Sequence, residues 1–243
     1  MTVVFVPPSG LPSDSRKKSL AKNPDVERQD KFRKDPRVPV EFRADDVDYV
    51  NSTLDRGHLA NSANYRTTQT LNDDTFYFSN MSPQVGIGFN RHYWGRLERS
   101  IRDLAKDETV ARVFVFTGQI FMPEQAPERG EAPSDNSSNE FTVTYRFIGA
   151  NHVPVPTHYF KSILAVRDDK NSGGKPRLRL WSYILPNEAI DSDRNIDDFA
   201  VTTDYLEHWA GFNLWSNLAA DIAGDLESKK IAAWQELPAS SVD

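Results

Sequence analysis

Three polar motifs lie within 44 residues and together offer the groups that hydrolytic chemistry needs. The first is Asp55-Arg56-Gly57-His58, the second runs from Ser79 to Gln84, and the third combines Asn90 with Glu98. A neutral imidazole takes a proton from water near neutral pH, because its unperturbed pKa is about 6.5. Gly57 permits a tight or positive-φ backbone, so we expect it to present the His58 ring at an unusual angle. Taken alone, a histidine of this kind is more often a structural residue of the surface or core, so His58 has to be interpreted together with the other motifs.

Asn90 and Glu98 fall in a segment, 88–107, whose apolar residues recur on one face of a helix. Eight residues place their side chains about 80° apart around the axis and about 12 Å apart along it. They therefore share a flank without both touching one small ion. Asn90 is also a good N-cap, and Glu98 can pair with Arg102 one turn later.

An amide oxygen with ordered waters is a poor zinc site and a reasonable magnesium site. Mg²⁺ prefers oxygen ligands, keeps several waters and often takes its remaining ligands from phosphate. With a histidine base and arginines nearby, the chemistry that fits is metal-assisted attack of water on a phosphodiester.

Several runs of β-forming residues, joined by short turns, alternate with helical segments. This order predicts an α+β fold with a central, mostly antiparallel sheet flanked by helices, in one domain over 1–243. We expect strands at 74–81, 111–121, 141–149, 157–168 and 177–186. Helices are expected at 88–107, within 14–35, and as short pieces after Asp197. A turn is predicted at 171–176 and a mobile, Pro/Ser-rich insertion at 122–140.

Composition narrows the class of protein. The chain has no cysteine, which excludes disulfides, thiolate nucleophiles and cysteine-bound metals. No apolar run has the length of a membrane span, and the opening residues lack the features of a targeting peptide, so we expect neither.

The net charge of −6 is unevenly spread along the sequence. Between Arg16 and Arg37 the sequence has nine Lys/Arg and four acids, whereas from Glu188 onward it has three bases and twelve acids. Such a distribution suits a one-sided groove for a polyanion, or simply a solvated charged surface.

The motifs "DRGH", "F-x-x-S-N-M-x-P-Q" and "F-N-x-x-x-W-x-x-L-E" resemble the signature of the DNA/RNA non-specific endonucleases of the ββα-metal (His-Me finger) class. The stretch 73–94 is similar to fungal members of the mitochondrial endonuclease G branch, and 115–121, 155–164 and 185–190 also match. The similarity runs from about Ser19 to Trp215, and 1–18 match poorly. It implies a sugar-non-specific endonuclease that hydrolyses DNA and RNA and leaves 5′-phosphate ends.

The resemblance also implies a role for each motif residue. His58 corresponds to the general base, Asn90 to the direct ligand of Mg²⁺, and Glu98 to the acid that holds the ion through water. Mn²⁺ is expected to substitute for Mg²⁺. Arg56 corresponds to a residue that adds positive charge at the site, and Asn80 to one that hydrogen-bonds the active-site network; both are also expected to bind substrate. Arg33 corresponds to an arginine that faces a phosphate. Asp55 is expected to fix the loop.

By the same resemblance we expect a homodimer, a protein inhibitor as a further partner, and a mitochondrial location. Two alternatives stay open: a related exonuclease that trims 5′ ends, and an inactive nucleic-acid-binding homologue. The chain departs from the family pattern at Asn61, which is more polar than usual there. It also departs at its start, where the first strand of the usual sheet is missing, truncated or replaced by Thr2–Val6.

Other polar and aromatic residues have simpler interpretations. Packing or surface roles are expected for His92, His152, His158 and His208. Lys161 either faces the groove or lies on a strand edge. The aromatic stripe of Trp209, Phe212 and Trp215 can stack bases, but this pattern is more typical of a core or a dimer contact.

Overall fold

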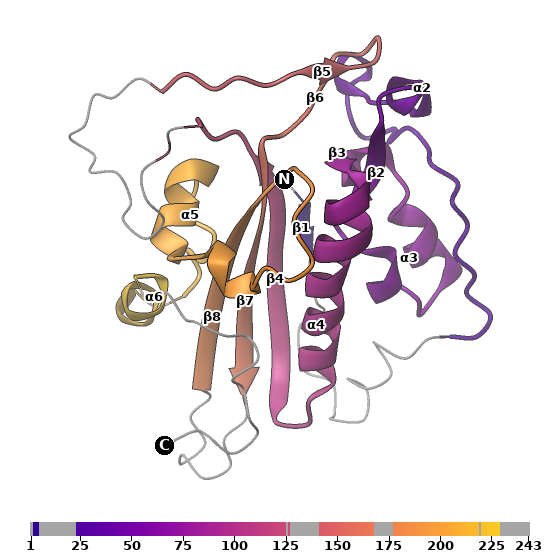
Figure 1. The fold of residues 1–243 in the computed structure, drawn as a ribbon. Helices are drawn as coiled ribbons and strands as arrows, with labels where there is room; N and C mark the ends of the chain where they lie inside the picture. The colour runs from indigo at the N-terminus through magenta and orange to yellow at the C-terminus, as the bar shows by residue number, and fades with distance from the viewer. Residues whose placement is uncertain are drawn as a thin grey trace.

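The computed structural model describes residues 2–4, 23–124, 126, 141–167, 177–218 and 220–228. Its centre is a five-stranded sheet in the order β1-β4-β7-β8-β9, in which every neighbouring pair is antiparallel. The strands are β1 (Thr2–Val4), β4 (Val110–Ile120), β7 (His158–Arg167), β8 (Arg177–Pro186) and β9 (Ala200–Val201). The predicted α+β class and antiparallel sheet are confirmed, and Thr2–Val4 supplies an edge strand beside β4 (Figure 1).

Helices cover both faces of this sheet. Because strand side chains alternate, Tyr159 and Ile163 of β7 lie in one apolar cluster, whereas Phe160 and Leu164 lie in another. The first cluster includes η4 (Gly86–Trp94) and α4 (Gly95–Lys106). The second includes α5 (Thr203–Ala210), with α6 (Ala220–Glu227) beside it, so the sheet lies between two helical layers (Figure 1).

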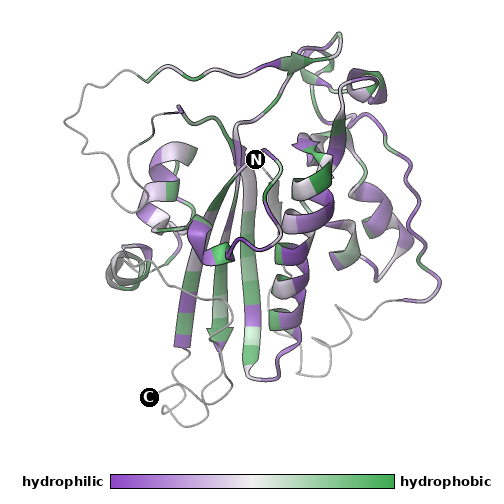
Figure 2. Cartoon of the chain, viewed as in Figure 1, coloured by the Kyte–Doolittle hydropathy of each residue, from purple (hydrophilic) through white to green (hydrophobic). Residues whose placement is uncertain are grey.

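The predicted helix over 88–107 is confirmed, with an irregular beginning. Its apolar stripe is buried against the sheet, while charged residues alternate with it along α4 (Figure 2). The stripe consists of Trp94, Leu97, Ile101 and Leu104. The first half is a π-helix that begins at a kink, where Gly88 has φ +84°. A side chain at Gly88 would be strained and would meet Ala189 at 2.8 Å, so glycine is required.

A separate two-stranded sheet lies beside α4. It pairs β2 (Leu54–His58) with β3 (Met81–Val85), and a smaller pair joins β5 (Phe147–Ile148) to β6 (Val153–Pro154). A third apolar cluster packs between these pairs. The short helices are η1 (Val40–Phe42), α2 (Asp46–Tyr49), η2 (Ser62–Asn64), α3 (Gln69–Asp74), η3 (Phe78–Asn80) and η5 (Ile196–Phe199).

Some predicted elements are wrong or lie outside the described residues. The segment 74–81 is not a strand: α3 ends at Asp74, η3 follows, and β3 begins only at Met81. The strand over 141–149 shrinks to Phe147–Ile148. No helix forms in 23–35, the described part of 14–35. The insertion at 122–140 is largely outside the described residues, and the turn at 171–176 wholly so. Among the described helices, none has the length and apolarity of a membrane span.

Candidate active site

The fold brings the three polar motifs together. Asp55-Arg56-Gly57-His58 forms most of β2, and the second motif ends in β3, its antiparallel partner. In this register Asp55 lies opposite Gln84 and His58 opposite Met81. The chain then turns directly into η4 and α4, which carry Asn90 and Glu98. The predicted site therefore combines two strands with the helix that follows them.

Three pairs of side chains tie the β2 segment, here β2 and the residues that follow it to Asn61, to this helix. Near its start, Asn90 Nδ2 donates to Asp55 Oδ2 at 2.9 Å, and Arg91 binds both oxygens of the same carboxylate at 2.8 and 2.5 Å. About two turns further on, Asn61 Nδ2 donates to Glu98 Oε2. Because the Asn90 amide nitrogen is held by Asp55, its Oδ1 is turned away from that carboxylate and remains available as a ligand.

Asn80 fixes the chain just beyond His58. Its Oδ1 accepts from the Ala60 amide at 2.9 Å, and its Nδ2 donates to the carbonyls of Ala60 and Thr75 at 3.0 and 2.8 Å. The side chain is buried. Since its donors and acceptor are used by backbone groups, this geometry favours a positioning role for Asn80 over direct contact with a substrate.

His58 lies among aromatic rings at the end of β2. Its ring packs edge-on against Phe76 with centroids 4.9 Å apart, and Phe32 lies 6.2 Å away. Burial, and then the positive charge of Arg28, lowers the pKa of His58 to about 4. The imidazole is therefore neutral at pH 7. Its buried Nε2 has no hydrogen-bond partner among the described residues.

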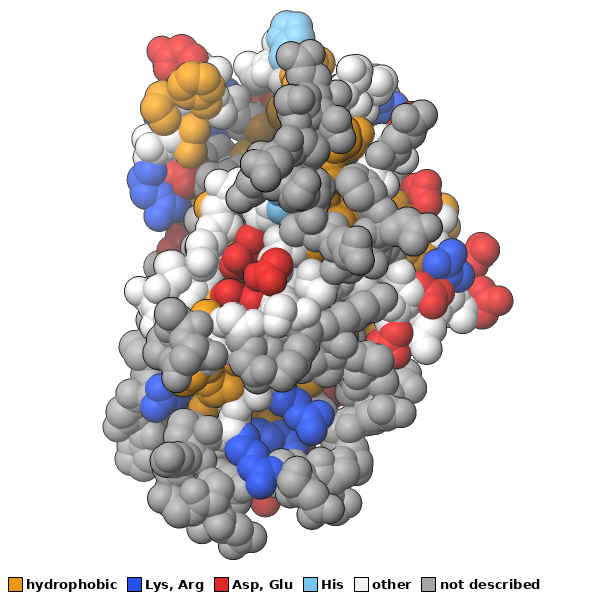
Figure 3. Space-filling view, turned by 90° about the vertical axis from the view of Figure 1, so that its left-hand side faces the viewer, with side chains coloured by type: hydrophobic (Ala, Val, Ile, Leu, Met, Phe, Trp, Pro, Cys, Tyr) orange, Lys and Arg blue, Asp and Glu red, His pale blue; other side chains and the backbone are white. Residues whose placement is uncertain are grey.

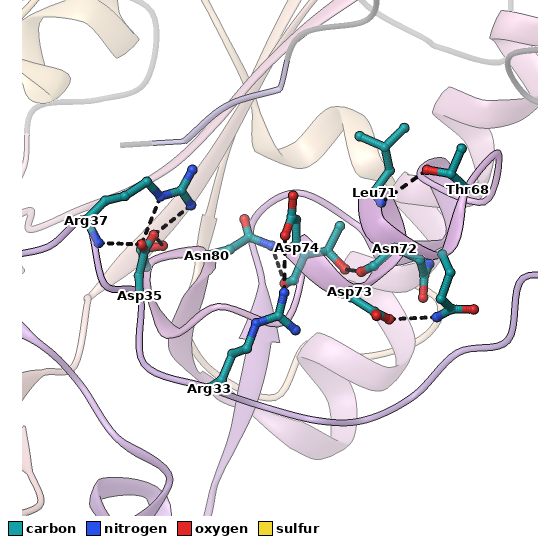
Figure 4. A network of polar contacts seen from close by, with 12 residues as sticks. Arg33, Asp35, Arg37, Thr68, Leu71, Asn72, Asp73, Asp74 and Asn80 are labelled. Carbon is teal, nitrogen blue, oxygen red and sulfur yellow. Dashed lines mark hydrogen bonds and ion pairs between the residues drawn. The ribbon is translucent and has the colours of Figure 1, made fainter.

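The two candidate arginines already have partners within the protein. Arg56 pairs with Asp46 at 2.6 Å and lies 5.5 Å from the ring centres of Phe32 and Tyr49. Arg33 pairs with Asp74 of α3 at 3.1 Å, which Figure 4 shows next to Asn80. Both guanidinium groups are engaged with protein carboxylates, so a phosphate would have to compete for them.

Gly57 is needed for a reason other than the predicted one. It does not have a positive φ and lies within the regular β2–β3 pair. A Cβ atom at this position would lie 2.1 Å from the side chain of Gln84. Gln84 is fully buried, and neither of its amide atoms has a hydrogen-bond partner among the described residues. Close packing, not backbone angle, explains this glycine.

Lys161 is also placed differently from either predicted alternative. It lies on β7, between β4 and β8, and only 3% of its surface is exposed, so it is neither on an edge nor in a groove. Its Nζ donates to Thr117 Oγ1 at 2.7 Å and lies 4.1 Å from the centre of the Trp94 ring. Burial lowers the pKa of Lys161 to about 8, and the nearby charge of Glu98 opposes this shift.

Glu98 is the buried acid of the group. It is 8% exposed, and burial raises its pKa, while Lys161 and then the Asn61 amide favour the ionised form. Sequence reasoning missed both of these partners. Asn61 was visible as an unexpected polar residue, whereas nothing in the sequence around Lys161 indicated that it would be buried behind Glu98.

The remaining candidates have structural contacts. His92 Nδ1 accepts from the Gly88 amide at 3.0 Å, and His158 contacts Thr157. His152 packs edge-on against Phe147, and His208 against Trp209. The aromatic stripe belongs to the second apolar cluster, in which Trp215 is buried and Trp209 and Phe212 pack against it. The core interpretation of this stripe is confirmed.

Comparisons with known proteins identify the family to which the chain is similar. The family described as DNA/RNA non-specific endonuclease matches residues 15–221. Nuclease C1 of Cunninghamella echinulata var. echinulata is 41% identical over 196 residues, covering 81% of this chain and 70% of the relative. The mitochondrial nuclease of Saccharomyces cerevisiae is 39% identical over 184 residues, covering 75% of this chain and 52% of the relative. Mitochondrial endonuclease G of Homo sapiens is 38% identical over 201 residues, covering 83% of this chain and 61% of the relative.

A solved structure is similar as well. The crystal structure of the EndoG/EndoGI complex, which concerns the mechanism of EndoG inhibition, aligns with a TM-score of 0.71 and 36% identity. The alignment covers 88% of this chain and 81% of that chain. The present chain spans only 52% and 61% of the yeast and human relatives, so their further length has no counterpart in these alignments.

Proposed function

Because this chain belongs to the DNA/RNA non-specific endonuclease family, we propose that it is a Mg²⁺-dependent endonuclease that cleaves both DNA and RNA and leaves 5′-phosphate ends. Its membership makes it a nuclease, a hydrolase that acts on nucleic acids. The proposed metal dependence, substrates and products rest on two contacts, Asp55 to Asn90 and Asn61 to Glu98. These contacts align the helix with the strand that ends in His58.

The residues present suit a hard divalent ion. Asp55 holds the Asn90 amide so that its oxygen is available, and Glu98 lies on the same helix, two turns further on. In the proposed site Asn90 is the direct ligand and Glu98 holds the ion through water, with Mn²⁺ able to replace Mg²⁺. When bound, the ion supplies positive charge for the phosphate oxygens and the leaving 3′ oxygen.

His58 supplies the base in this proposal. Because its pKa is held near 4, the imidazole is neutral and accepts a proton from the attacking water at pH 7. The water oxygen bonds to phosphorus, the bond from phosphorus to the 3′ oxygen breaks, and solvent protonates that oxygen. Phosphate remains on the 5′ end, as the proposed products require.

The remaining motif residues hold the substrate or the site. Asn80 keeps the backbone after His58 in place through three hydrogen bonds. Arg56 and Arg33 contact phosphates after releasing Asp46 and Asp74, and charge-assisted pairs of this kind are the strong ones. Such contacts read the backbone and not the bases, so we expect loose sequence preference and strong inhibition by salt.

Location and partners follow from the relatives. Several are called mitochondrial, so we propose that this protein acts in mitochondria. A solved relative is bound to EndoGI, which supports a protein inhibitor as a partner. We also propose a homodimer. Size-exclusion chromatography with light scattering tests the dimer directly, and a monomeric mass at micromolar concentration would contradict it.

The activity is tested with supercoiled plasmid, linear duplex and single-stranded RNA at low salt, with Mg²⁺ or with a chelator. We expect Mg²⁺-dependent nicking of the plasmid and cleavage of RNA. His58→Ala and Asn90→Ala should abolish both, whereas His208→Ala, on α5, should not. Release of nucleotides only from linear ends would favour an exonuclease. No cleavage of any substrate would indicate an inactive homologue.

A further inference from the structure

An acidic cluster lies between the two C-terminal helices, on the face of the sheet opposite α4. Asp204 and Glu207 are three residues apart on α5, and Glu227 ends α6. One carboxylate oxygen from each lies within 4.8 Å of the other two. Figure 3 shows acidic side chains gathered near the middle of this side of the molecule.

Glu227 distinguishes this cluster from an ordinary acidic surface. It is only 6% exposed, and its Oε1 is buried without a hydrogen-bond partner among the described residues. A buried carboxylate oxygen without a donor is unfavourable, and two further carboxylates within 4.8 Å add repulsion. Burial raises the pKa of Glu227, so either a proton or a bound cation relieves this repulsion, and a cation relieves it for all three acids at once.

The other two acids are oriented toward the same place. Glu207 Oε1 accepts from the Leu214 amide at 2.7 Å, and the Trp215 backbone also hydrogen-bonds this carboxylate, so two backbone donors fix the side chain. Burial, and in part the neighbouring Glu227 carboxylate, raises the pKa of Glu207 to about 7. Asp204 is exposed, so the cluster is open to solvent on one side.

We propose that Asp204, Glu207 and Glu227 bind a divalent cation, best matched by Ca²⁺, that fastens α6 to α5. Ca²⁺ takes carboxylate oxygens at about 2.4 Å, so two of its ligands lie up to about 4.8 Å apart. Mg²⁺ requires a near-ideal octahedron and keeps most of its waters, so three carboxylates from two helices suit the more flexible coordination of Ca²⁺ better. Water on the open side near Asp204 completes the six to eight ligands of Ca²⁺.

This site is independent of the proposed nuclease site. Its three ligands come from α5 and α6, which pack on the second apolar cluster, while Asn90 and Glu98 lie on the helix of the first. The ion would act on the docking of the C-terminal helix. It should therefore change stability even in a protein that cannot cleave nucleic acid.

The test uses the full chain with Asn90→Ala, so that the proposed Mg²⁺ site does not contribute. Ca²⁺ binding is measured by calorimetry and by its effect on the unfolding temperature, with Tb³⁺ as a luminescent substitute. Adding Glu227→Gln should weaken Ca²⁺ binding at least tenfold and remove the thermal shift. Glu188→Gln, an exposed acid outside the cluster, is the matched control and should bind as the parent does.

The outcomes separate the possibilities. Without cation, Glu227→Gln should be at least as stable as the parent, because it removes repulsion and keeps the shape, and Asp204→Asn provides a second, exposed variant. Saturable Ca²⁺ binding that is lost in both variants supports the site. Equal binding by the Glu227→Gln and Glu188→Gln proteins would overturn it, as would binding of Mg²⁺ without Ca²⁺.

Discussion

Replacing Lys161 by methionine tests whether the buried charges behind the candidate site stabilise one another. Lys161 is 3% exposed in the middle of β7, and its Nζ donates to Thr117 Oγ1. The acid whose charge opposes its pKa shift is Glu98, itself 8% exposed. Methionine has a similar length and keeps the packing against Trp94, so the substitution removes mainly the charge.

The expected loss is large for a single substitution. Removing one partner of a buried charge pair costs about 3–5 kcal/mol, because the other charge remains in a poorly polar environment. The lower end of this energy range applies to Lys161→Met, because Glu98 still has the hydrogen bond from Asn61 and the attraction of Arg102 in this variant. We therefore expect Lys161→Met to lower the free energy of unfolding by about 3 kcal/mol.

A double-mutant cycle isolates the pair. Glu98→Gln leaves Lys161 without its anion, but a lysine with a pKa near 8 can lose its proton at modest cost. The double variant should therefore be about 2 kcal/mol more stable than the sum of the single losses predicts. Lys106→Met is the control: its ion pair with Asp103 is exposed, so its loss should stay below about 0.5 kcal/mol.

The assay is urea unfolding with a chelator present, comparing midpoints between variants of equal m-value. The pH dependence gives a second measure. Because folding lowers the pKa of Lys161 from 10.5 to about 8, the unfolded chain holds more protons between these values, so stability should rise with pH there. Lys161→Met should lack that rise. A loss under about 1 kcal/mol, or strict additivity with Glu98→Gln, would refute the reasoning.

Three further predictions concern the β2 segment. Gly57→Ala should lower stability by about 1–3 kcal/mol in urea unfolding, because its Cβ would displace the buried Gln84. For His58, the acid limb of kcat/KM should fall below the ordinary value of 6.5, toward 4, in an activity–pH profile. Without metal, stability should also decline as pH falls from 6.5 toward 4, since only the unfolded His58 gains a proton there. Asn61→Ala should reduce kcat about 10- to 100-fold by removing the donor to Glu98, measured by plasmid nicking.

Each of these has a distinguishing control. Gly57→Ala combined with Gln84→Ala should lose less stability than the two changes added, and additivity would exclude the close contact as the cause. An acid limb at or above 6.5 would contradict a buried neutral imidazole. Asn61→Asp keeps the acceptor for the Ala63 amide but opposes Glu98, so it should be as inactive as Asn61→Ala or more so. Full activity of Asn61→Asp would mean that Asn61 serves only as the N-cap of η2, where its side chain accepts from the Ala63 amide.

The regular parts of the fold were predictable because each carries one clear periodic signal. The helix over 88–107 buries its stripe against a sheet, and the long strands β4, β7 and β8 are continuous β-forming runs. The run 74–81 has equally strong β propensity but does not form a strand. Phe76 and Phe78 are buried there by packing against Phe32 and His58, and a bridge from Arg33 to Tyr77 fixes the turn. Tertiary packing overrides propensity at this position.

The candidate site was predictable in its residues but not in their supports. The resemblance identified His58, Asn90 and Glu98 by type and order. It could not show that Asp55 would hold Asn90, because the two are 35 residues apart. The strand containing Lys161 was predicted, but its place in the sheet depends on which strands flank it, and no local pattern records that.

The contacts that shape the candidate site differ in what they support. Asp55 and Asn61 join the β2 segment to its helix near the surface, so losing either should misplace Asn90 or Glu98 before it unfolds the chain. Lys161 and Glu98 lie between that helix and the sheet, where a lone charge affects stability as well. The acids of α5 and α6 lie on the opposite layer and share none of these contacts. Variants of Asp55 and Asn61 should therefore lose turnover, and variants of Lys161 and Glu98 should lose both turnover and stability. Variants of the acids on α5 and α6 should lose cation binding alone.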